Sequence, residues 1–261
     1  MTQDFLDGPV RPASTLMLLR DDPAFEGLMV ERHHAIDFAG GALVFPGGKS
    51  HVGDHEEAWS GHALGWDTHG VVQAGLRIAA IRELFEEAGL LLARRVDGRP
   101  LEIEPASLEL RQSVDRGETA FIDVVRAAGV QLDLSALTVF ARWITPPVSA
   151  KRFDTWFYLA HAPADQLAVC DGRETVDACW YAPEAARGAA ERGERKVVFP
   201  TRINLGRLAQ STSAALAISE AAKRPIVPVQ PEIHDGPDGR RLVLPEAAGY
   251  GAISEPFLPG M

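Results

Sequence analysis

The segment that decides the fold lies at residues 82–90 and consists of Arg82-Glu83-Leu84-Phe85-Glu86-Glu87-Ala88-Gly89-Leu90. Apolar residues recur at helical spacing from about Val72 to Ala88, and this pattern predicts an amphipathic helix. Gly89 stands where a left-handed C-terminal cap belongs, so we expect the helix to end at Ala88.

Three acidic residues of this segment share one face of the predicted helix, because Glu83, Glu86 and Glu87 are three or four positions apart. Arg82 is adjacent to them in sequence, and we expect it to point to a different part of the helix surface. Neighbouring carboxylates repel one another, and Mg²⁺ or Mn²⁺ would relieve that repulsion by binding their oxygens. Since an isolated acidic face is usually solvated surface, the flanking residues must decide between surface and metal site.

The flanking residues form a longer pattern with the acidic segment. Phe45-Pro46-Gly47-Gly48 reads as the end of a strand followed by a sharp turn, and Asp54 follows Gly48 after five residues. Together with residues 82–90 this arrangement resembles the Nudix box, G-x5-E-x7-R-E-U-x-E-E-x-G-U, where U is a bulky aliphatic residue. The second half matches at every specified position. Asp54 replaces a glutamate, and 27 residues instead of seven separate it from Arg82, an insertion of 20 residues inside the box.

The resemblance implies an α+β fold, an α/β/α sandwich with a mixed β-sheet between helices and a helical insertion. We expect one domain over residues 1–261, with insertions at about 49–70 and 91–135 and a C-terminal extension from about 197. The insertion inside the box is similar to that of peroxisomal coenzyme A diphosphatases. Residues 29–48 partly match the coenzyme A signature of that group, at Arg32, Gly41 and the turn.

The same resemblance implies a metal-dependent hydrolase that cleaves the diphosphate of a nucleoside diphosphate derivative. Coenzyme A or acyl-coenzyme A is the favoured substrate, with 3′,5′-ADP and phosphopantetheine or its acyl form as products. Glu83, Glu86, Glu87 and the Gly48 carbonyl would bind Mg²⁺ or Mn²⁺, and Arg82 would orient the carboxylates and pair with Asp54. The general base is either a box glutamate or Glu174 on a later loop, and the candidate substrate contacts are Arg32, Arg142 and Arg152.

Two alternatives stay open. The box fixes the chemistry and says little about the second substrate group, so NADH, ADP-ribose or a nucleotide sugar could take the place of coenzyme A. A non-catalytic nucleotide-binding or regulatory module is a different class, although the intact Arg82 and glutamates argue against it.

His51 and His55 are four residues apart and could suggest zinc, but their polar, glycine-containing loop favours a solvated or lid role. Trp59 and Trp66 in the same loop could stack on substrate or pin the loop to the body.

Composition sets the remaining expectations. The 36 acidic residues outnumber the 26 basic ones, a net charge of −10 that disfavours polynucleotide binding and leaves a small nucleotide as the expected partner. The N-terminal residues do not read as a secretory signal, Cys170 and Cys179 are too few for a disulfide framework, and the C-terminal residues do not form the peroxisomal address. We therefore expect a cytoplasmic protein without membrane association. The oligomeric state is open, with a homodimer as one option.

Other segments carry clear local patterns. Residues 14–33 read as a β-hairpin, and residues 42–45 as a strand. Further strands are expected at 137–144, 155–160 and 178–181, with a hairpin over 233–244. Helices are expected at 105–130, as one or two elements, and at 183–191 and 201–222. Residues 49–70 are expected to form a polar loop.

Overall fold

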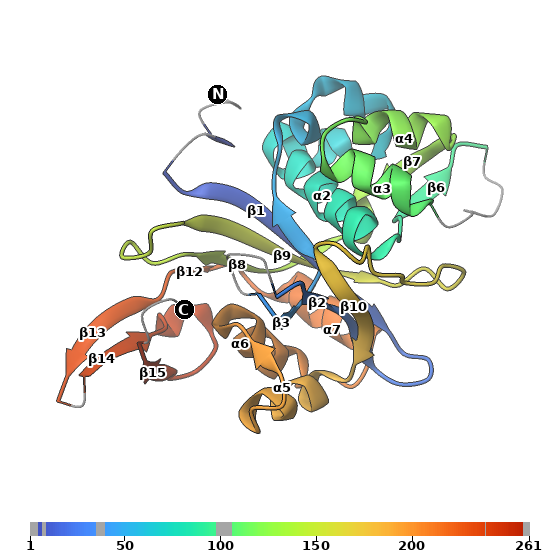
Figure 1. Cartoon of the computed structure of the whole chain (residues 1–261). Coiled ribbons are helices and arrows are strands. Elements are labelled where there is room, and N and C mark those ends of the chain that lie inside the picture. The colour runs from blue at the N-terminus through green and yellow to red at the C-terminus, as the bar shows by residue number, and fades with distance from the viewer. Residues whose placement is uncertain (1–4, 7–8, 35–39, 98–105, 238, 258–261) are drawn as a thin grey trace.

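The computed structural model of the chain describes residues 5–6, 9–34, 40–97, 106–237 and 239–257. A mixed β-sheet lies between two layers of helices, which confirms the expected α/β/α sandwich (Figure 1). Parts of three expected features fall outside the described residues: residues 35–39 of the upstream signature, 98–105 of the second insertion, and the turn residue Asp238.

The central sheet contains nine strands within the described residues, and its centre is covered on both faces. β1 (Arg11–Arg20) pairs in parallel with β9 (Phe153–His161), while β2 (Glu26–Arg32) is antiparallel to β1 and β8 (Thr138–Ile144) is antiparallel to β9. β1 is buried along most of its length, as expected for a strand with helices on both sides. The full order is β11 (Lys196–Val197), β3 (Ala42–Val44), β2, β1, β9, β8, β12 (Pro228–Val229), with β4 (Gly47–Lys49) beside β1 and β10 (Thr175–Tyr181) beside β2.

The predicted acidic helix is α2 (Trp66–Ala88), and it covers one face of the sheet (Figure 1). Gly70 adopts φ 70° and ψ 158°, so the regular helix begins just after it, close to the expected start at Val72. Gly89 has φ 72° and its amide donates to the Phe85 carbonyl, which confirms the predicted cap. The outer side of α2 is covered by α3 (Leu108–Asp115), α4 (Phe121–Ala127) and a small sheet of β5 (Ala63–Leu64), β7 (Val130–Asp133) and β6 (Ala93–Arg95).

The in-box insertion is more ordered than the polar loop that we expected. It forms two short 3₁₀ helices, Val52–His55 and Glu57–Gly61, followed by β5. Trp59 is 1% exposed, and its indole Nε1 donates to the Gly53 carbonyl at 2.8 Å. Trp59 and Trp66 both lie in the core beside α2, so they pin the insertion to the body.

The opposite face of the sheet carries α5 (Pro183–Glu191), α6 (Phe199–Leu208) and α7 (Ala214–Lys223). The single helix expected at 201–222 is wrong, because the chain breaks between α6 and α7. The Ser213 side chain accepts from the Leu216 amide, and Asp21 accepts from the Ala214 amide, so both groups cap the start of α7. The C-terminal hairpin is confirmed as β13 (Glu232–Gly236) and β14 (Gly239–Val243), to which β15 (Ser254–Pro256) adds a third strand.

Candidate active site

Gly47 and Gly48 follow the bend between β3 and β4 and open β4, and they bring this turn of the backbone against the acidic end of α2. A Cβ atom on Gly48 would lie 2.5 Å from both carboxylate oxygens of Glu83, and one on Gly47 would clash with the Ser14 carbonyl. The Gly47 amide donates to Glu87 Oε2 at 3.0 Å. The turn therefore requires glycine because carboxylates and strand backbone occupy the space of a side chain.

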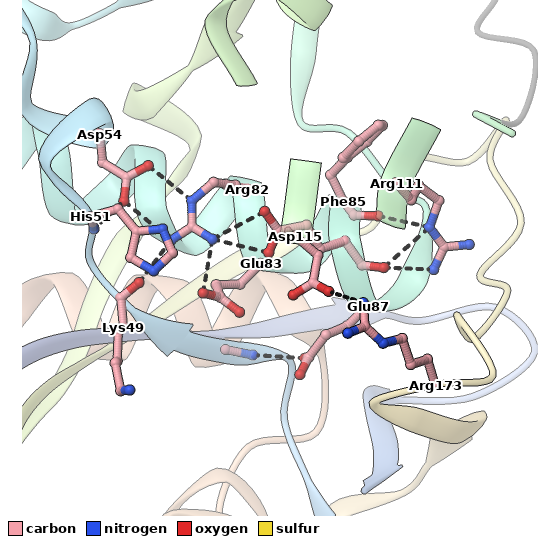
Figure 2. Close-up of polar contacts among 12 residues, drawn as sticks. Lys49, His51, Asp54, Arg82, Glu83, Phe85, Glu87, Arg111, Asp115 and Arg173 are labelled. Atoms are coloured by element: carbon pink, nitrogen blue, oxygen red, sulfur yellow. Dashed lines mark hydrogen bonds and ion pairs between the residues drawn. The ribbon is translucent and has the colours of Figure 1, made fainter. Parts of the chain in front are cut away.

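Arg82 is the centre of a buried charge network that joins both halves of the box (Figure 2). Its Nε donates to Asp54 Oδ1 at 2.9 Å, and its Nη1 donates to Glu83 Oε1 at 2.9 Å and Glu86 Oε2 at 3.0 Å. Nη2 donates to the Lys49 carbonyl at 2.7 Å. The pairing with Asp54 is as expected.

The expected direction of Arg82 is wrong. Sequence adjacency to Glu83 suggested a different part of the surface, but the long side chain folds along the helix and reaches Glu83 and, one turn later, Glu86. Arg82 therefore holds two of the three carboxylates as well as Asp54. Through Asp54 it also ties the in-box insertion to α2.

The carboxylates of this network are buried, which excludes the solvated-surface interpretation. Glu83, Glu86 and Glu87 are 8%, 7% and 3% exposed. Burial raises the pKa of all three and brings that of Glu86 to about 8, while Arg82 opposes the rise at Glu83 and Glu86. Burial lowers the pKa of Arg82, but the adjacent carboxylates outweigh this effect and raise it well above its usual value. The site thus holds four carboxyl groups, those of Asp54 and the three glutamates, around the single guanidinium of Arg82.

This donor set fits a hard divalent cation. It combines buried carboxylate oxygens with the turn backbone at Gly48, where a side chain would fill the space. Within the described ranges, no three Asp, Glu, His or Cys side chains already converge on one point. Glu83 and Glu86 bond to Arg82, and Glu87 bonds to the Gly47 amide.

The last turn of α2 is held by donors from two distant segments. Arg111 of α3 donates from Nε to the Phe85 carbonyl at 3.0 Å and from Nη2 to the Glu86 carbonyl at 2.9 Å. Thr175 Oγ1 donates to the Glu87 carbonyl at 3.2 Å, and the Val169 amide donates to the Ala88 carbonyl at 2.9 Å. The Glu86, Glu87 and Ala88 carbonyls are among those that a helix end leaves without intrahelical partners, whereas the Phe85 carbonyl also accepts from the Gly89 amide. The clamp fixes the turn that carries Glu86 and Glu87.

Glu174 and Arg32 lie at the Glu87 end of the network. The Glu174 carbonyl accepts from the His33 amide at 2.8 Å, next to Arg32, and both residues act electrostatically on Glu87. A small hollow there is lined by Glu86, Glu87, Arg111, Gln112, Asp115, Asp171 and Glu174. Burial raises the pKa of Glu174, and nearby Asp115 adds to the rise.

The other two candidate substrate contacts lie on the β8–β9 hairpin. Arg142 on β8 pairs with Asp154 of β9, with Nε 2.8 Å from Oδ1, and its guanidinium lies 5.0 Å from the Trp156 ring centre. Arg152 Nε donates to the Thr145 carbonyl at 3.1 Å. Thus the structure groups Arg32 and Glu174 with the box, while Arg142 and Arg152 contact residues of the β8–β9 hairpin.

Several residues of the site carried no signal in the sequence. Arg111 and Asp115 come from an insertion helix, and Asp171 accepts the Glu174 and Thr175 amides at 3.0 and 2.7 Å. Asp171 stands before a glycine, and such an Asp-Gly pair is typical of a turn whose acid bonds its own backbone. His55 is a core residue, because it bonds Ser50 Oγ at 2.7 Å and packs against Gly75.

Comparison with known proteins decides the family. The domain family described as the NUDT19 Nudix domain matches residues 69–208, which is more than half of the chain. The chain belongs to this Nudix family. The match begins close to the start of α2 and ends at the last residue of α6.

Individual relatives agree with this assignment. Acyl-coenzyme A diphosphatase NUDT19 from Xenopus laevis is 26% identical over 204 residues, covering 62% of this chain and 54% of the relative. The human protein of the same name is 28% identical over 222 residues, covering 67% of this chain and 59% of the relative. The chain thus spans a little over half the length of these relatives. A crystal structure of a NUDIX hydrolase from Alicyclobacillus acidocaldarius superposes with a TM-score of 0.71 at 27% identity, covering 83% of this chain and 98% of that one.

No helix within the described part of this Nudix chain combines the length and apolarity needed to cross a bilayer.

Proposed function

We propose that the chain, acting as one domain, hydrolyses the diphosphate linkage of coenzyme A or acyl-coenzyme A in a reaction that depends on Mg²⁺ or Mn²⁺. The products would be 3′,5′-ADP and phosphopantetheine or its acyl form. The observation that carries the proposal is the buried cluster of Glu83, Glu86 and Glu87 against the Gly47–Gly48 turn. The substrate class is supported by the similarity to the acyl-coenzyme A diphosphatases from Xenopus laevis and Homo sapiens.

Different residues of the network would bind the cation and hold its ligands in position. Glu83, Glu86, Glu87 and the Gly48 carbonyl would hold the cation, which supplies charge neutralisation for the diphosphate and a more acidic bound water. Arg82 would keep Glu83 and Glu86 in place, since it donates to both.

Glu174 is the proposed acceptor of the proton from the attacking water. It lies at the Glu87 end of the site, and its raised pKa makes it a stronger base than an ordinary glutamate. Arg32, beside Glu87, is the proposed contact for the diphosphate, and Arg142 and Arg152 are proposed contacts for more distant parts of the substrate.

A substrate panel tests the proposal. The purified full chain is incubated with Mg²⁺ or Mn²⁺ and coenzyme A, acyl-coenzyme A, NADH, ADP-ribose or a nucleotide sugar, and products are separated by chromatography. Fastest cleavage of a coenzyme A compound, abolished by EDTA, is the expected result. Faster cleavage of another member would overturn the substrate class and keep the hydrolase. No cleavage of any member would favour a non-catalytic module.

Glu87→Gln tests the role of the cluster. We expect kcat to fall at least about a hundredfold, because removing a metal-ligating charge costs several kcal/mol of transition-state stabilisation. Glu109→Gln is the matched control, since Glu109 is an exposed glutamate of α3. Unchanged turnover in a folded Glu87→Gln variant would contradict the proposed site.

A further inference from the structure

A second hollow lies on the other side of the sheet from α2. Helices α5 and α6 form one wall, and residues 249–255 form the other. The family match ends at residue 208, so one wall belongs to the Nudix domain and the other to the segment that follows it. The cavity measures about 290 Å³, and its charged and aromatic lining consists of Arg187, Glu191, Arg202, Arg207, Tyr250 and Glu255. A volume near 300 Å³ is at the lower end of the range for small-molecule sites.

The positive charge of this cavity is only partly compensated. Arg202 pairs with Glu255, and Arg187 Nη2 pairs with Glu184 at 2.5 Å. Arg207 differs, because it donates to the Ala248 carbonyl at 2.5 Å and lies 3.2 Å from the Tyr250 ring centre. No carboxylate within the described residues pairs with it. Burial lowers its pKa, which marks a guanidinium that lacks a compensating anion.

One buried donor without an acceptor belongs to the lining of this cavity, that of Arg187, and two more belong to residues that interact with the lining residues Tyr250 and Arg207. Within the described part of the chain, Arg187 Nε, Arg224 Nε and Asn204 Nδ2 are buried and have no hydrogen-bond partner. Glu191 Oε1 is 3.9 Å from Arg187 Nε, too far for a hydrogen bond. Arg224 acts electrostatically on Arg207, so the two cations lie near each other. Buried donors normally have partners, and this excess of donors predicts an acceptor-rich ligand.

The cavity wall is rigid on its aromatic side. Asn204 is fully buried, and its Oδ1 accepts from Tyr250 Oη at 2.6 Å and from Trp143 Nε1 at 3.2 Å. Arg207 covers the face of the same tyrosine ring. Ile203 and Ile253 complete the lining with apolar surface. A ligand would therefore meet guanidinium groups together with an aromatic and aliphatic wall.

We propose that this cavity binds a phosphate monoester, with the phosphate on Arg207 and its neighbouring arginines and the organic group against Tyr250. Guanidinium forks match phosphate oxygens in geometry, and a bound phosphate would compensate the charge of Arg207 and supply an acceptor to Arg187 Nε. The site is independent of the proposed hydrolysis, because α2 and the acidic cluster cover the opposite face of the sheet.

Calorimetric titration of the full chain in EDTA tests the site, with AMP, orthophosphate and adenosine as probes. EDTA removes divalent cations, so the acidic cluster cannot bind phosphate through a metal. Binding of AMP and orthophosphate without binding of adenosine is expected, and tighter binding of AMP would identify the organic group as part of the ligand. Equal affinity for both would locate recognition in the phosphate alone, and absence of binding by both would overturn the proposal.

Gly206 offers a matched pair of variants. It lies in α6 on the cavity wall, and a Cβ atom there would meet Arg187 Cδ at an ordinary 3.8 Å. Gly206→Ala should leave AMP affinity within about twofold, whereas Gly206→Glu places a carboxylate among the arginines and should weaken it at least about tenfold. Equal affinity of both variants would contradict the site.

Arg207→Gln provides a test that does not depend on the folding of the Gly206→Glu variant. We expect a loss of AMP affinity of about tenfold or more, since it removes the guanidinium that lacks a carboxylate partner. Lys223→Gln is the control, because it removes one exposed positive charge from α7. If both substitutions weaken binding equally, the attraction is general and the cavity is not the site.

Discussion

The two faces of the sheet carry opposite charge imbalances. On the α2 face, Asp54, Glu83 and Glu86 surround Arg82, with Glu87 close by, and burial raises the pKa of all three glutamates. On the face that carries α5 and α6, the Nε atoms of Arg187 and Arg224 and the Nδ2 atom of Asn204 have no hydrogen-bond partner among the described residues. Each local excess indicates a ligand of the opposite sign, a cation for the first and an anion for the second.

The net charge of the chain does not predict the second of these regions, the one with an excess of buried donors. A net charge of −10 disfavours anionic ligands when it is spread over the whole surface. Desolvated groups respond chiefly to neighbours within a few ångströms, because screening by water is weak at buried positions. Buried groups without partners therefore carry information about the charge of a ligand that the composition of the chain does not.

Arg82→Met should have the largest effect, because it removes the cation from the acidic network. Three buried carboxylates would lose their partner, and breaking a buried ion pair costs about 3–5 kcal/mol. Urea unfolding of the metal-free protein measures the loss, with Arg116→Met as an exposed control. A loss no larger than in the control would mean that the carboxylates are protonated or solvated.

Arg111→Gln should have a smaller effect on the same region. It removes donors from the Phe85 and Glu86 carbonyls, and a lost hydrogen bond from a charged group costs about 1–3 kcal/mol. Arg111→Lys should recover part of the loss. Arg192→Gln, at an exposed pair with Glu194, is the control for arginine removal. An unfolding free energy equal to that of the control would show that the clamp adds nothing to stability.

The acidic region should also make the stability of the chain depend on pH, through the buried carboxyl group of Glu86. Glu86 has a pKa of about 8 in the folded chain and a value near 4.5 when unfolded, so the folded state binds the proton more tightly. Its contribution to stability is therefore complete below pH 4.5 and is lost as the pH rises to about 8. The midpoint temperature of thermal unfolding, measured in EDTA, should therefore fall by a few degrees as the pH rises from 4.5 to about 8.

Two controls accompany this measurement. Glu86→Gln should flatten the slope, because glutamine does not titrate. Added Mg²⁺ or Mn²⁺ should also reduce it, because a bound cation favours the ionised carboxylates. A slope unchanged by Glu86→Gln would assign the effect to other groups.

Glu255→Gln should have the smallest effect and should act only on the second region. It frees Arg202 from its carboxylate and increases the local excess of positive charge. Because this pair is partly exposed, we expect AMP affinity to rise only about two- to fivefold. Titration of AMP in EDTA measures the change, and a decrease would show that the Arg202–Glu255 pair itself shapes the site.

Local signals in the sequence predicted the scaffold well. The spacing of apolar residues and Gly89 placed the end of α2, and the glycines at 47 and 48 placed the turn against it. The C-terminal hairpin followed from a similar local pattern, whereas the sandwich was expected from the resemblance to the Nudix box. These features depend on backbone conformation and on burial of one face, both of which short segments encode.

Features that depend on tertiary contact were missed. Arg111 and Asp115 reach the site from an inserted helix, and no spacing links them to α2. The direction of Arg82 was mispredicted because its side chain is long enough to choose among several acceptors. The break between α6 and α7 depends on Ser213 and on Asp21, which is nearly two hundred residues away in the chain.

The clamp on the last turn of α2 limits how far this chain can be shortened. A minimal version without residues 91–135 would keep every residue of the box, yet it would leave the Phe85 and Glu86 carbonyls without the donors of Arg111. The insertion thus supports the acidic turn as well as the core, and truncation should weaken the proposed cation site.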